Sequence, residues 1–82
     1  MTMRVVFLGR IGERAGGPRT LDTEGLATVA DATARLSEAE PDLAALLSAP
    51  STITVLDDAV ARADTPLGDA RELAYLPPVS GG

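Results

Sequence analysis

The sequence predicts one α+β domain in which a mixed five-stranded sheet carries one main helix and a short helix on one face. Its 82 residues are enough for one domain and too few for two. Two short β-branched stretches come first, a stretch with helical periodicity follows, and three further strand-like stretches end the chain. A content of 45% hydrophobic and 23% charged residues is typical of a folded protein rather than a disordered one.

The first predicted strand covers residues 3–8 and is apolar on both faces, so both faces need a covering layer. Gly9 ends this strand, and residues 9–17 follow as one helical turn ended by glycine. Their glycine spacing suggests a phosphate-binding loop, but no Gly-Lys-Ser/Thr ends the segment, so we interpret it as a plain turn. Residues 19–22 form a short second strand.

The main helix begins after Thr28, which has the capping-box spacing to Asp31. One apolar stripe along it consists of Val29, Ala32, Leu36 and Ala39. On the opposite side, Asp31 and Arg35 have the spacing of an ion pair. Pro41 ends this helix and starts a shorter one, whose apolar face is Leu43, Leu46 and Leu47.

Three strands are predicted after the helices, over residues 51–56, 59–61 and 72–76. Asp57-Asp58 forms the turn between the first two, and Pro77-Pro78 stops the last because proline cannot continue a ladder. A right-handed crossover makes the first and last strands parallel neighbours in the middle of the sheet.

This arrangement covers one face of the sheet and leaves the other bare. Strand alternation predicts Val5, Phe7, Leu73 and Tyr75 in the core. It places Leu8, Val60 and Leu76 on the bare face as an exposed apolar patch. Scattered surface leucines are the alternative interpretation.

The composition excludes several classes of function. Without Cys or His the chain has no thiolate nucleophile, no disulfide, no usual general base and no zinc-ligand set, and we expect it to hold no metal. Its net charge of −5 disfavours nucleic acid and anionic membranes as partners. No apolar run approaches the roughly 20 residues of a membrane span, and the start lacks the form of a signal peptide, so a cytoplasmic location is expected.

The last six residues form a predicted tail, residues 77–82, attached to a domain of residues 1–76. The tail consists of Pro77, Pro78, Val79, Ser80, Gly81 and Gly82, without a charged side chain. Prolines favour an extended chain, and six residues reach roughly 20 Å. Terminal glycines lack a β-carbon, so such an end fits a narrow channel. An idle, frayed terminus is the alternative.

The whole chain resembles the small, sulfur-carrying subunit of molybdopterin synthase, in the MoaD/ThiS-like family of ubiquitin-like β-grasp proteins. The strongest match is the segment from Glu72 to Gly82, in which an acid and an alternating strand precede Pro-Pro-Val, a small residue and Gly-Gly. The opening strand, and Asp64 with Pro66-Leu67 before the last strand, support it.

The resemblance implies that Gly82 is adenylated by an enzyme similar to those that activate ubiquitin, which consumes ATP, and then becomes a thiocarboxylate. It implies insertion of residues 77–81 into the large synthase subunit, in a heterotetramer, where the sulfur builds the dithiolene of molybdopterin from cyclic pyranopterin monophosphate. The family's docking positions fall on Leu8, Val60 and Leu76. The chain itself would bind no cofactor and show no turnover alone, because it would be a carrier subunit.

Three alternatives remain open at this stage. The chain could carry sulfur for thiamine or cysteine synthesis, since those β-grasp relatives also end in Gly-Gly. It could be a protein modifier joined through Gly82 to lysines. It could also be a β-grasp module that only binds through its sheet, with an idle tail.

Overall fold

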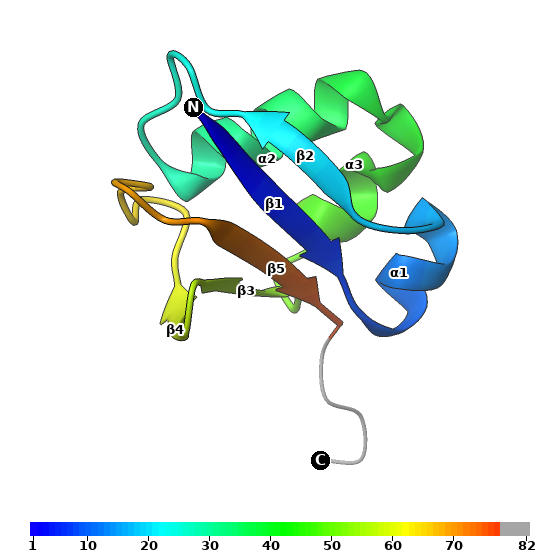
Figure 1. Ribbon diagram of the computed structural model, residues 1–82. Helices are drawn as coiled ribbons and strands as arrows, with labels where there is room; N and C mark the ends of the chain where they lie inside the picture. Colours follow the sequence, from blue (N-terminus) through cyan, green and yellow to red (C-terminus); the bar gives the residue numbers. More distant parts are fainter. Residues whose placement is uncertain (78–82) are drawn as a thin grey trace.

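The computed structural model describes residues 1–77 and has the predicted β-grasp fold (Figure 1). In chain order the elements are β1 (Thr2–Phe7), α1 (Gly9–Ala15), β2 (Arg19–Asp22), α2 (Val29–Ala39), α3 (Pro41–Ser48), β3 (Ile53–Leu56), β4 (Ala59–Ala61) and β5 (Glu72–Leu76). The strands form one sheet in the order β2-β1-β5-β3-β4. Helices α2 and α3 cover one face of it, and α1 lies at the end where β1 and β5 finish.

The two central strands, β1 and β5, are parallel neighbours, as predicted from the crossover. Val5 pairs with Leu73 and Phe7 with Tyr75, and the remaining strand pairs are antiparallel. Because paired residues point to the same face, this register puts the four side chains into one layer beneath the helices. The last strand is therefore held at the centre of the sheet on both of its edges.

Helix α2 begins with the predicted capping box. The Asp31 N–H donates to Thr28 Oγ1 at 3.3 Å, while Asp31 Oδ2 accepts from the N–H groups of Ala27 and Thr28. These backbone hydrogen bonds lower the pKa of the Asp31 carboxyl. The predicted ion pair with Arg35 is wrong, because the capping role occupies this carboxylate and Arg35 donates to the Asp22 carbonyl instead.

Helix α1 is the main departure from the predicted elements. It has seven residues where the sequence predicted a single turn, and it ends at Gly16 in the left-handed conformation, with φ 81°. Ile11 on this helix is buried in the core. At Gly12 a β-carbon would clash with the carbonyl oxygen of Phe7, so glycine here permits close packing of α1 on the end of β1.

A bidentate ion pair connects the junction between α2 and α3 to β2. Arg19 Nε donates to Glu40 Oε2 at 2.8 Å and its Nη2 donates to Oε1 at 2.6 Å. The hydrogen bonds to Glu40 raise the pKa of Arg19. Pro41 begins α3 as predicted, and because the chain turns at Glu40, Ala39 is exposed instead of joining the apolar stripe.

Tyr75 is fully buried in the core, as alternation predicts. Its ring stacks on Phe7 with centroids 5.8 Å apart, and its hydroxyl shares a 2.7 Å hydrogen bond with Thr33 Oγ1 on α2. The bond satisfies the one polar atom that this side chain brings into the core. Burial raises the pKa of Tyr75 to about 12.

We expect this tyrosine to make the fold sensitive to alkali. The phenol pKa rises from 10.0 to about 12 on folding, so its stabilising contribution is complete below pH 10 and is lost as pH rises toward 12. The loss amounts to about 3 kcal/mol in the free energy of unfolding. As the only tyrosine of the chain, it is followed directly by phenolate absorbance. Tyr75→Phe should remove this pH dependence; a wild-type titration near pH 10 in the folded state would contradict the assignment.

Candidate functional site

The candidate site is the sheet face turned away from α2 and α3, here called the outer face. Strand register places Val6, Ala74, Val55 and Val60 in one row across β1, β5, β3 and β4. Ile53 pairs with Leu76 in the next row toward the end of β5. Since Phe7, Leu73 and Tyr75 face the helices, alternation turns these rows outward. Aliphatic side chains therefore cross four neighbouring strands without an intervening charge.

The three residues that the sequence assigned to docking lie on or beside this apolar part. Val60 on β4 is 77% exposed and Leu8 is 42% exposed, whereas Leu76 is half-buried. The sequence predicted Leu8 within the first strand, but β1 ends at Phe7 and Leu8 lies one residue beyond it. Its backbone is extended, so its side chain still lies on the same sheet face as that of Val6. Its N–H donates to the Tyr75 carbonyl at 3.0 Å, which places Leu8 beside the end of β5.

The other end of the outer face is polar. Arg4 pairs with Glu72 in the sheet and their side chains lie 3.8 Å apart. Thr20 and Asp22 occupy the outer positions of β2 and are exposed. The face is thus divided into a polar end near the amino terminus and an apolar end next to the start of the tail.

Two members of the apolar rows, Ile53 and Val55, were missed by the sequence reasoning. Their signal was the same period-two alternation in residues 53–56, since Thr54 and Leu56 share a face with core residues. Ala74 also faces outward but is nearly covered, because Val6 and Val55 lie on either side of it.

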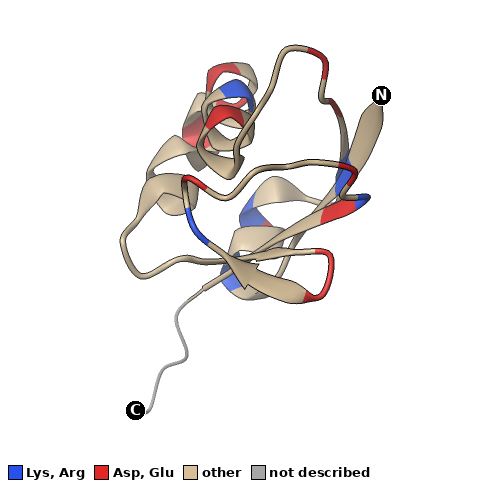
Figure 2. Cartoon of the chain, turned by 90° about the vertical axis from the view of Figure 1, so that its left-hand side faces the viewer, with Lys and Arg blue, Asp and Glu red and all other residues tan. Residues whose placement is uncertain are grey.

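Charged side chains of the described residues do not gather into one patch. Figure 2 shows acidic and basic residues spread over helices, loops and strand ends. Recognition through the outer face would therefore depend mainly on apolar contact. The excess negative charge would affect the rate at which a partner approaches and would not form a localised ion-pairing site.

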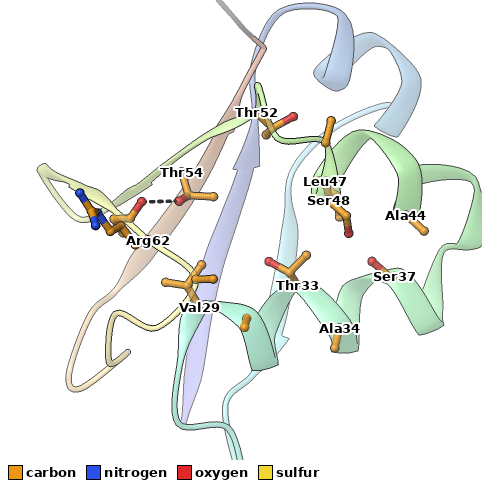
Figure 3. A pocket seen from close by; sticks show the side chains of 14 residues that line it. Val29, Thr33, Ala34, Ser37, Ala44, Leu47, Ser48, Thr52, Thr54 and Arg62 are labelled. Atoms are coloured by element: carbon orange, nitrogen blue, oxygen red, sulfur yellow. Dashed lines mark hydrogen bonds between the residues drawn. The ribbon is translucent and has the colours of Figure 1, made fainter.

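A second concave surface lies on the helix side, between α2, α3, β3 and β4, with a volume of about 650 Å³ (Figure 3). Its three threonine hydroxyls are used internally: Thr33 bonds Tyr75, Thr54 donates to the Ala61 carbonyl and Thr52 donates to the Leu46 carbonyl, whereas the buried Ser37 Oγ has no partner among the described residues. Among the described residues that line it, Arg62 alone is charged. The groove therefore offers no acid–base pair for catalysis among the residues described.

Residues 1–77 contain no group of three or more acidic, His or Cys side chains placed to hold a metal. Nor does this part of the chain contain a helix long and apolar enough to cross a bilayer. The tail residues Pro78, Val79, Ser80, Gly81 and Gly82 lie outside the described residues, and their assigned roles stay predictions. Pro77 is described and is half-buried at the end of β5.

The sheet order and the helices on one face define a ubiquitin-like β-grasp protein. A comparison with protein-family profiles matches residues 5–82 to the ThiS family. The chain belongs to the ThiS family. Comparison with curated protein sequences gives no significant match.

Solved structures similar to this chain include archaeal modifier proteins and a complex of molybdopterin-converting factor. SAMP1 from Haloferax volcanii is 28% identical over 100% of both chains, with a TM-score of 0.85. The small archaeal modifier protein 1 of Methanosarcina acetivorans, 24% identical over 99% of this chain and 96% of its own, has a TM-score of 0.79 and bears on the fold alone. A chain in a complex of subunits 1 and 2 of molybdopterin-converting factor from Helicobacter pylori is 26% identical to this chain. The match covers 100% of this chain and 100% of that one, with a TM-score of 0.66.

Proposed function

We propose that this chain is the sulfur carrier subunit of molybdopterin synthase, with Gly82 as the loaded residue. The observation that carries the proposal is the position of the apolar end of the outer face, which adjoins the start of the tail at Leu76. A partner that covers Leu8, Val60 and Leu76 would meet the tail at the edge of the same contact. The family match extends through Gly82, and one similar structure is a complex of two molybdopterin-converting-factor subunits.

The proposed chemistry starts from an unreactive carboxylate, which is ionised at neutral pH and resists nucleophiles. A Gly82 carboxylate oxygen attacks the α-phosphorus of ATP, the bond to the bridging oxygen breaks, and pyrophosphate leaves with that electron pair. A hydrosulfide-level donor then attacks the carbonyl carbon, the bond to the adenylate oxygen breaks, and AMP leaves. Loss of the proton from sulfur gives the thiocarboxylate, without oxidant or reductant.

The catalytic groups for these steps would belong to other proteins. The chain has no Cys or His, and residues 1–77 contain no group of acidic side chains placed to hold a metal. The carrier supplies a folded domain, a docking face and a narrow C-terminal tail. An activating enzyme would consume the ATP, and the large synthase subunit would take the sulfur into the dithiolene of molybdopterin.

Protein modification is a second candidate, which the similarity to SAMP1 of Haloferax volcanii favours. The two functions share the acyl-adenylate and differ in the acceptor, which is sulfur in one case and a lysine amine in the other. The chain has no lysine of its own, so self-conjugation through a lysine is not available to it.

The experiment gives the thiocarboxylated chain to the large synthase subunit and cyclic pyranopterin monophosphate. We expect dithiolene formation in proportion to the carrier consumed, and none with the carboxylate form. Incubation of the adenylated chain with cell protein is the parallel assay. Conjugates at lysine without dithiolene formation would replace the proposed function with that of a modifier.

A further inference from the structure

The residue that follows the last strand, Pro77, lies directly against the first residue of α1, Gly9. A β-carbon at Gly9 would come within 2.7 Å of Pro77 Cγ and 3.2 Å of its Cδ. Carbon atoms in ordinary contact are roughly 3.5–4.0 Å apart. The proline ring therefore occupies the space that any side chain at position 9 would need.

The backbone around Gly9 explains why this space exists. Leu8 is extended, with φ −109° and ψ 159°, and Gly9 has φ 57°, which turns the chain into α1. The Leu8 N–H also donates to the Tyr75 carbonyl. The segment Leu8–Gly9 therefore contacts the last strand twice: Leu8 hydrogen-bonds β5, and Gly9 lies against Pro77, the residue after β5. The start of α1 lies beside the end of β5 (Figure 1).

We propose that Gly9 is a positioning residue for the tail: its missing side chain lets Pro77 seat against α1 and so sets the direction in which the following residues leave the domain. The inference rests on the proposed function, in which the tail enters a partner while the outer face is docked. Proline fixes its own φ near −65°, so the seat of its ring constrains the backbone direction at the root. Over a tail that reaches roughly 20 Å, a small rotation at the root moves the far end by several ångströms.

Relief of the contact would move the main chain and not only the ring. Repuckering shifts Cγ, but Cδ is bonded to the backbone nitrogen, so the 3.2 Å contact with Cδ is relieved only by a shift of a few tenths of an ångström in the backbone of Pro77 or of Gly9. Over a tail of roughly 20 Å such a shift at the root becomes a displacement of about 1 Å or more at the reacting carboxylate, and a misplacement of about 1 Å there costs up to about a hundredfold in rate. Gly9 thus influences the chemistry through Pro77 without touching the reacting atoms.

The test compares Gly9→Ala with Gly68→Ala in the full chain. Gly68 has nearly the same backbone, with φ 52°, but nothing within 4 Å of its β-carbon position, so it carries the same backbone penalty without the contact to the tail. The assay is ATP-dependent loading by an activating enzyme that loads the wild-type chain. We expect Gly9→Ala to lower kcat by about tenfold or more with KM nearly unchanged, because the substitution leaves the side chains of the outer face as they are. Gly68→Ala should match the wild type.

A double-mutant cycle separates positioning of the tail from loss of folding. Pro77→Ala removes Cγ and Cδ, so Gly9→Ala should have little further effect in the Pro77→Ala background. A nuclear Overhauser contact between Gly9 Hα and the Pro77 ring should be present in the wild type and lost in Gly9→Ala. Equal loading of the two glycine variants, or an undiminished effect of Gly9→Ala in the Pro77→Ala background, would overturn the inference alone. A wild-type chain that is not loaded would overturn the proposed function and this inference with it.

Discussion

Removal of Gly82 should abolish loading of the carboxyl terminus and leave the free energy of unfolding unchanged. The shortened chain still ends in glycine, so the chemical nature of the terminal group is the same, but the carboxylate lies about 3.5 Å short of its former reach. Reacting atoms must approach within roughly 3–3.5 Å, so we expect a loss of at least about a thousandfold in the rate of adenylation. The rate is measured as ATP-dependent release of pyrophosphate.

Two further variants distinguish the effect of tail length from the effect of side-chain bulk at the C-terminus. Gly82→Ala keeps the length and adds one β-carbon, which tests whether the partner channel is narrow. One glycine added after Gly82 tests whether excess length is tolerated. Every member of the described hydrophobic core lies between Met3 and Tyr75, so thermal unfolding should not distinguish these chains. Undiminished adenylation of the shortened chain would remove the tail from the mechanism.

Val60→Asp should weaken binding to the large synthase subunit about 30-fold. Val60 is 77% exposed in the free chain, so the substitution costs the fold little. In the docked state it buries a carboxylate without a partner, and about 2 kcal/mol of lost affinity corresponds to that change in Kd. The measurement is a titration of the two subunits by calorimetry.

Thr20→Asp is the matched control, because it adds the same charge to the outer face at its polar end. It should change affinity by less than about threefold, through long-range repulsion alone. Leu76→Asp, at the centre of the apolar end, should weaken binding at least as much as Val60→Asp, although its half-buried position also costs stability. If Val60→Asp and Thr20→Asp weakened binding equally, the apolar end would not be the contact surface.

The sequence predicts most of the fold because the signals of its elements are local. Alternation in β1 and β5, the Thr28 capping box and Pro41 at the start of α3 act over a few residues, and all are confirmed. The pair of Arg19 and Glu40 could not be predicted, because 21 residues separate its members and tertiary packing alone brings them together.

For the candidate site, the sequence predicts an apolar outer face but not its extent. Val60 and Leu76 follow from alternation, whereas the row through Val55 depends on which residues of β3 and β4 are paired, and that register is a long-range property. The contact between Gly9 and Pro77 joins residues 68 positions apart in the chain, and single-sequence patterns do not contain it.

The central claim is that the carboxyl group of Gly82 is the atom group that carries sulfur. Its most direct test is mass spectrometry of the chain after incubation with ATP, an activating enzyme proven on its own carrier, and sulfide. The account predicts replacement of one oxygen by one sulfur, located by fragmentation at the carboxyl of Gly82 and dependent on ATP. An unchanged mass, or sulfur found at any other residue, would contradict it.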